Sequence, residues 1–151
     1  MTTVVKKLFR GKVKASRNRP DFVITPDSTV GFCARPSFDA EFNERGTEAL
    51  IIVELKPPGV QIGDIEKAQV WRYVRELKDA GHVLDTTAVT GFVPGDSIHP
   101  AETANRTEGP NVVIRPLLYT AFMGQAEKRM PTLHDKLRNT PMMQAAIAEF
   151  A

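Results

Sequence analysis

The sequence predicts an α/β fold in which a mixed central β-sheet is flanked by helices. Three observations predict it. A strand-like hairpin ends in a β-branched apolar run at residues 51–55, a helical segment follows at 64–80, and further strand-like runs come after that segment. A hairpin pairs its strands antiparallel, whereas a strand reached through a crossover helix pairs parallel, so we expect both kinds of neighbour in one sheet.

The first third of the chain predicts short strands and the hairpin. In chain order we expect a basic strand and an apolar strand within residues 13–25 with a turn at 18–20, a loop rich in turn formers at 26–37, and a hairpin at 38–56 whose turn is 43–46. Pro57 and Pro58 then end the second strand of the hairpin, because proline has no N–H to donate to a sheet.

The remainder predicts the crossover helix, two strands and a helical end. Gly63 or Asp64 caps the helix at 64–80, and Gly81 closes it. We then expect, in order, a strand at 87–93, a long polar stretch at 94–110, a strand at 111–115, a helix at 117–129, and a helical tail at 131–151 that Pro141 breaks.

The composition is that of a soluble globular protein. The chain has 151 residues, 42% of them hydrophobic and 25% charged, and no apolar stretch approaches the roughly 20 residues that span a bilayer. No signal peptide is visible, and the single cysteine, Cys33, suits a reducing compartment. We therefore expect one cytoplasmic domain over 1–151, with a basic arm at 1–12 and a helical tail at 131–151, and no membrane partner.

Basic residues gather at the amino terminus. Residues 1–19 hold seven basic and no acidic side chains, while the formal net charge of the whole chain is only +2. Such an arm suits contact with a phosphate backbone, although a solvated tail or a contact with acidic parts of a neighbouring subunit explains it equally well. The candidate nucleic-acid contacts are Lys6, Lys7, Arg10, Lys12 and Lys14.

Glu54 and Lys56 stand at the end of the run at 51–55. Alternate residues of a strand share a face, so we expect the two side chains side by side at the rim of the sheet. A carboxylate and an ammonium held there are costly to desolvate. Two explanations are open: a divalent metal bound beside an activated water, or a lysine that pairs with the glutamate and extends its charge to solvent.

Three short motifs occur in an order that resembles the PD-(D/E)xK nuclease superfamily. They are Arg19-Pro20-Asp21, Val53-Glu54-Leu55-Lys56-Pro57, and Gln69 followed four residues later by Tyr73. The glutamine-tyrosine helix is similar to that of the RecB-like branch. The stretches at 53–77 and 92–129 look most like the carboxy-terminal nuclease domain of Shedu-type antiphage proteins. The resemblance covers about residues 13–130 and implies a restriction-endonuclease-like core.

The resemblance also implies an activity: hydrolysis of DNA phosphodiester bonds with Mg²⁺, or with Mn²⁺ in its place, in antiphage defence or DNA processing. A bound Mg²⁺ acts as a Lewis acid, activates a water near neutral pH and prefers hard oxygen ligands. The implied ligands are the carboxylates of Asp21 and Glu54 and the backbone carbonyl of Leu55.

The resemblance assigns the remaining roles to side chains near that ion. Lys56 would orient the attacking water and stabilise charge in the transition state. Gln69 would fix Lys56 or a metal-bound water, and Tyr73 would form a hydrogen bond near a phosphate. For both residues the plain alternative is a helix face that packs on the sheet.

Several assignments stay open. Asp21 precedes Glu54 by 33 residues and Asp39 precedes it by 15, and we prefer Asp21 because it has the Pro-Asp context of the family. Instead of an enzyme, the chain could be a nucleic-acid-binding or assembly module that keeps the fold without turnover. RNA is an alternative substrate, and further copies of the chain or a larger regulatory chain are the other expected partners.

Overall fold

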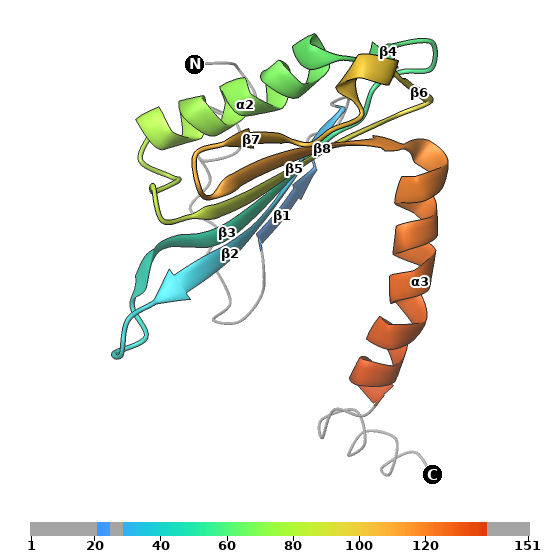
Figure 1. The fold of residues 1–151 in the computed structure, drawn as a ribbon. Helices are drawn as coiled ribbons and strands as arrows, with labels where there is room; N and C mark the ends of the chain where they lie inside the picture. The colour runs from blue at the N-terminus through green and yellow to red at the C-terminus, as the bar shows by residue number, and fades with distance from the viewer. Residues whose placement is uncertain (1–20, 25–28, 139–151) are drawn as a thin grey trace. The chain divides into compact units, whose positions relative to one another are not determined.

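The computed structural model describes residues 21–24 and 29–138 of the chain (Figure 1). They belong to two compact units, residues 1–118 and 119–151, each of which is described by itself. Among the described residues, the first unit holds the sheet and one long helix, and the second is a single helix. That the whole chain is one nuclease-like domain with a basic arm and a helical tail stays a prediction.

The first unit is built on a six-stranded sheet in the order β1-β2-β3-β5-β8-β7 (Figure 1). The strands are β1 (Asp21–Ile24), β2 (Val30–Phe38), β3 (Glu44–Glu54), β5 (Ala88–Gly95), β8 (Val112–Leu118) and β7 (Arg106–Glu108). β1, β2 and β3 pair antiparallel, β3, β5 and β8 pair parallel, and β7 pairs antiparallel with β8. The predicted α/β class with a mixed sheet is therefore confirmed.

Small elements and one long helix connect these strands. They are β4 (Gln61–Ile62), which pairs in parallel with β6 (Ser97–Ile98), the short helix η1 (Pro100–Glu102), and α2 (Asp64–Asp79). α2 begins after its N-cap Gly63, whose N–H donates to the Glu66 carboxylate at 2.8 Å. It ends beside Gly81, whose φ of +75° favours glycine. The helix predicted at 64–80 is confirmed.

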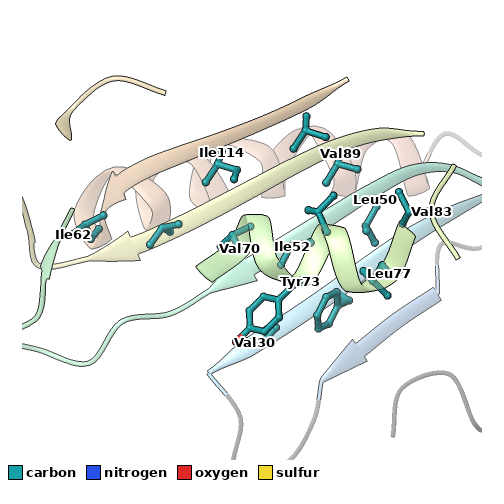
Figure 2. Packing of buried hydrophobic residues seen from close by; sticks show 14 residues of the cluster. Val30, Leu50, Ile52, Ile62, Val70, Tyr73, Leu77, Val83, Val89 and Ile114 are labelled. Atoms are coloured by element: carbon teal, nitrogen blue, oxygen red, sulfur yellow. The ribbon is translucent and has the colours of Figure 1, made fainter. Parts of the chain in front are cut away.

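The core lies between α2 and one face of the sheet (Figure 2). Leu50 and Ile52 are buried alternate residues of β3, and Val70 and Leu77 of α2 belong to the same cluster. Each such side chain removed from water contributes about 1.5–3 kcal/mol. α2 approaches closely at Gly91 of β5, where an added Cβ would lie 2.6 Å from Val70 Cγ1. The lack of a side chain at Gly91 therefore sets how near α2 lies to the sheet.

The hairpin corrects two expectations from the sequence. β2 begins at Val30, inside the stretch predicted to be a loop, and the hairpin turn is at 39–43 instead of 43–46. Pro36 fits inside the strand because the register of β2 against β3 shifts next to it. The turn comes earlier because the Asp39 carboxylate accepts the Asn43 N–H at 2.7 Å.

The later elements follow the sequence more closely. The strands expected at 87–93 and 111–115 are confirmed as β5 and β8, and the polar stretch between them contains β6, η1 and β7. In the second unit, α3 (Tyr119–Arg138) continues through Pro131, where the sequence predicts a break between two helices. The proline removes one N–H bond on an exposed helix surface, where water can satisfy the carbonyl that loses it. Neither helix in the described residues is long and apolar enough to cross a membrane.

Candidate active site

The segment after β3 is fixed by backbone hydrogen bonds to the residue just before β2 and to β5. The N–H of Leu55 donates to the carbonyl of Thr29 at 2.8 Å, and the N–H of Lys56 donates to the carbonyl of Pro94 at 3.0 Å. Glu54 and Lys56 are both buried, with exposed fractions of 3% and 7%. Two ionisable side chains in such a place are costly unless other groups compensate for the lost water.

Gln69 and Tyr73 of α2 join this pair in one hydrogen-bonded cluster. Lys56 Nζ donates to Glu54 Oε1 at 3.2 Å and to Gln69 Oε1 at 2.7 Å. Gln69 Nε2 donates to Glu54 Oε1 at 3.0 Å and to the Tyr73 hydroxyl oxygen at 2.9 Å. The structure thus brings together four of the residues singled out in the sequence, two from the end of a strand and two from one helix.

The packing of α2 explains why Gln69 reaches the end of β3. Gln69 and Tyr73 are four residues apart, so their side chains share a helix face. Tyr73 packs edge-on against Phe32 of β2, with the ring centroids 6.3 Å apart. Val70, next to Gln69, is seated over Gly91. The apolar contacts of the helix therefore place its polar side chains at the site.

The two carboxylate oxygens of Glu54 have different surroundings. Oε1 accepts hydrogen bonds from Lys56 and Gln69, and Thr29 Oγ1 lies 3.4 Å from it. Oε2 is buried and has no hydrogen-bond partner among the described residues. Burial raises the pKa of Glu54, and Lys56 opposes that rise through its charge and its hydrogen bond. Burial also raises the pKa of Tyr73, so its hydroxyl stays protonated near neutral pH.

Oε2 of Glu54 is the atom that fits a cation. A buried carboxylate oxygen without a donor is uncommon in folded proteins, and a bound ion is one of its few explanations. Mg²⁺ binds through one or two carboxylates and keeps several waters. No three His, Cys, Asp or Glu side chains gather into a metal site within residues 21–24 and 29–138. Glu54 therefore fits an ion that keeps most of its water ligands.

The strand pairing places the backbones of the two aspartates considered as the second carboxylate away from the end of β3. Asp39 is in the hairpin turn just after Phe38, while Glu54 pairs with Val30 at the other end of β2, which spans about 26 Å at 3.3 Å per residue. The open alternative that Asp39 shares an ion with Glu54 is therefore wrong. Asp21 pairs with Ala34, about 13 Å from the level of Val30 along the strand. This register does not bring the backbone of Asp21 to Glu54, and its role as a metal ligand stays a prediction.

The predicted roles of the amino-terminal basic residues and of the Leu55 carbonyl also stay predictions. The basic residues Lys6, Lys7, Arg10, Lys12 and Lys14 lie outside the described residues. Leu55 has a bonded N–H and is 41% exposed as a residue, and the role of its carbonyl as a metal ligand stays a prediction.

Sequence reasoning missed the contribution of Thr29. Its carbonyl and its hydroxyl both meet the end of β3, so the chain just before β2 lies beside Glu54. The sequence signal is a second Pro-Asp pair, Pro26-Asp27, whose aspartate is two residues before Thr29. Residues 25–28 lie outside the described residues, so Asp27 is a candidate from chain connectivity alone.

Comparison with known proteins adds no relative. No protein-family model, no curated protein and no solved structure matches this chain. The candidate site therefore stands on the geometry of its own residues.

Proposed function

We propose that this chain is a metal-dependent nuclease domain with a restriction-endonuclease-like core, which hydrolyses phosphodiester bonds of DNA in antiphage defence or DNA processing. The observation that carries the proposal is the buried Glu54 carboxylate. Lys56 and Gln69 hold one of its oxygens, and the other has no partner among the described residues. Leaving such a group unsatisfied costs roughly 1–3 kcal/mol, and a bound cation removes that cost.

Glu54 Oε2 would hold Mg²⁺ or Mn²⁺, which supplies Lewis acidity at the scissile phosphate and lowers the pKa of a bound water. Lys56 would supply a fixed positive charge beside it. Its ammonium is held from two sides, by Glu54 Oε1 and by Gln69 Oε1, so it keeps one orientation. A charge that is already oriented stabilises developing negative charge on the phosphate without reorganising during the reaction.

Gln69 and Tyr73 would complete the arrangement. Gln69 binds Lys56 through its oxygen, and Glu54 and Tyr73 through its nitrogen, so a single amide fixes three groups. The Tyr73 oxygen accepts this hydrogen bond, which leaves its own O–H to donate to a phosphate oxygen. The raised pKa of Tyr73, caused mainly by burial, keeps that proton in place.

A cleavage assay tests the proposal. Supercoiled plasmid, linear DNA and single-stranded RNA are incubated with the full chain in Mg²⁺, in Mn²⁺ and in EDTA. We expect cleavage of DNA with either metal and no cleavage in EDTA. DNA binding without cleavage under every condition would indicate the binding or assembly module instead. Cleavage confined to RNA would change the substrate class.

The variants Lys56→Gln and Lys78→Gln distinguish a specific role of Lys56 in cleavage from a general effect of losing one positive charge. Lys78 is also a lysine of the first unit, but it pairs with exposed Asp85 at 3.0 Å, away from the site. Lys56→Gln should lower the cleavage rate by about a hundredfold or more, and Lys78→Gln should not change it. Thermal melting of both variants shows whether they are folded. Equal activities in two folded variants would contradict the role of Lys56.

A further inference from the structure

Arg72 lies on α2 between the two site residues of that helix. It follows Gln69 by three positions and precedes Tyr73 by one, so its side chain leaves the helix next to the buried cluster. Burial raises the pKa of Glu54 and of Tyr73, and the positive charge of Arg72 is among the influences that oppose both rises. Unlike the residues of the cluster, Arg72 is exposed. It places a positive charge on the solvent side of the site.

In the described part of the first unit, carboxylates hold most of the lysines and arginines, but none of them holds Arg72. The pairs are Arg35–Glu48, Arg45–Asp39, Lys56–Glu54, Lys67–Glu102, Lys78–Asp85, Arg106–Asp64 and Arg106–Glu108. Arg75 lies over the ring of Trp71, 6.0 Å from its centroid. Among the lysines and arginines in the described part of the first unit, only Arg72 and Arg115 have neither an ion pair nor a ring contact.

These two arginines lie on opposite sides of the sheet. Arg115 follows the buried Ile114 of β8, and successive residues of a strand point to opposite faces. Its side chain therefore belongs to the face away from α2, whereas Arg72 is on α2 itself. Within the described part of the first unit, the two exposed arginines without an ion pair or a ring contact are therefore Arg72, on the helix that carries Gln69 and Tyr73, and Arg115, on the far face of the sheet.

We propose that Arg72 binds a backbone phosphate of the nucleic-acid substrate next to the phosphodiester that is cleaved at Glu54. The inference rests on the proposed nuclease function. A guanidinium presents its donors as a planar fork that matches two phosphate oxygens. No carboxylate of the described residues pairs with Arg72, so binding a phosphate breaks no such ion pair, whereas Arg106 would lose its bonds to Asp64 and Glu108.

A contact between Arg72 and a phosphate would fix the position of the nucleic-acid strand that is cleaved. α2 is seated on the sheet through Val70 and Gly91, so a phosphate held by Arg72 has a fixed place relative to Glu54 and Lys56. Phosphate contacts orient a nucleic acid without reading its bases. The effect of Arg72 on binding should therefore be the same for every sequence tested.

Duplex binding measured against salt concentration tests the inference. The full chain binds a labelled DNA duplex in EDTA, where no cleavage interferes, and the variants are Arg72→Gln, Arg72→Lys and Arg115→Gln. Arg72→Gln should weaken binding roughly tenfold and make the slope of log affinity against log salt shallower by about 0.9. Arg72→Lys should keep most of the slope but only part of the affinity, because it keeps the charge and loses the fork.

Arg115→Gln is the matched control, since it removes the same charge from an exposed, unpaired arginine on the other face. It should leave affinity and slope close to those of the unaltered chain. Equal losses in the two glutamine variants would show a long-range effect of net charge, and no loss in Arg72→Gln would show no contact; either result overturns the inference. If the unaltered chain cleaves DNA in a parallel assay, the proposed function survives that failure. A chain that neither binds nor cleaves overturns both.

Discussion

Each end of the β2–β3 hairpin has a carboxylate, and the two carboxylates have opposite surroundings. At the turn, Asp39 accepts the N–H groups of Glu41 and Asn43 and lies 3.2 Å from Arg45 Nε. At the other end, Glu54 is buried, and its Oε2 has no donor among the described residues. The N–H of Asn43 is the main reason that the pKa of Asp39 is lowered, whereas burial raises the pKa of Glu54.

The comparison shows that Asp39 stabilises the fold through its hydrogen bonds, whereas burying Glu54 is unfavourable to the fold. Asp39 makes the turn possible, since its oxygens satisfy backbone groups that the turn leaves unpaired. Among the described residues no backbone N–H donates to Glu54, and ionising it in its buried position is unfavourable. Perturbed groups of this second kind are found mostly where chemistry or binding needs them.

The largest expected effect distinguishes the two carboxylates by activity. Glu54→Gln keeps an oxygen that can accept from Lys56 and Gln69 but removes the charge, so it should lower DNA cleavage by more than about a hundredfold. Asp39→Asn should leave the cleavage rate within a few-fold of the starting value. Initial rates on linear DNA in Mg²⁺ measure both. Similar losses in the two variants would remove the distinction.

A second comparison asks which aspartate accompanies Glu54. The register places Asp21 opposite Ala34, while Thr29, two residues after Asp27, meets the end of β3. We expect Asp27→Asn to reduce cleavage by on the order of a hundredfold and Asp21→Asn to reduce it much less. The same rate assay decides between them. A large loss in Asp21→Asn alone would restore the preference drawn from the sequence.

A smaller effect is expected at the amide that joins the cluster. Gln69→Ala removes a hydrogen bond to each of Glu54, Lys56 and Tyr73, and loss of such supporting groups lowers activity by about ten- to a hundredfold. Tyr73→Phe removes the last of these bonds and the O–H proposed to donate to a phosphate, but it leaves the bonds of Gln69 to Glu54 and Lys56, so it should cost less. Steady-state kinetics of the single variants and the double variant measure the coupling. Strictly additive losses would mean that the cluster does not act as a unit.

The sequence predicts the parts of the site that lie within one element. Glu54 and Lys56 alternate on a strand that two prolines end, and Gln69 and Tyr73 are one helical turn apart between Gly63 and Gly81. Such spacings carry geometric information by themselves. The structure adds that the strand end and the helix face meet.

The parts of the fold and of the site that depend on strand register could not be predicted from local spacing. The start of β2 contains turn formers and Pro36, which a register shift accommodates, so local propensity predicts a loop where tertiary pairing makes a strand. That error displaced the turn and hid the contact of Thr29 with Glu54. The ion pair between Lys67 and Glu102 is another contact that local sequence does not predict, because the two residues are far apart in the chain.

The smallest effect is a difference in how pH changes stability in EDTA. The pKa of Asp39 lies below its ordinary 3.8. The stability that ionised Asp39 contributes is therefore present above pH 3.8 and is lost as pH falls through the lowered pKa. The pKa of Glu54 lies above its ordinary 4.5, so its contribution is present below 4.5 and is lost as pH rises through the raised pKa.

Melting temperatures between about pH 3 and about pH 7 measure this difference. Asp39→Asn should flatten the loss of stability on the acid side, and Glu54→Gln should flatten the loss that occurs as pH rises above 4.5. A Glu54→Gln profile parallel to that of the unaltered chain would contradict the raised pKa.

Metal binding measured by titration calorimetry tests the central claim most directly, because it asks whether the unsatisfied oxygen of Glu54 binds a cation. Mn²⁺ is titrated at neutral pH into the unaltered chain, into Asp39→Asn and into Glu54→Gln. We predict equal binding by the first two and no measurable binding by the third. Binding to the unaltered chain should also weaken as pH is lowered through the raised pKa of Glu54, since a proton then competes with the ion. Unchanged Mn²⁺ affinity in Glu54→Gln would contradict the account.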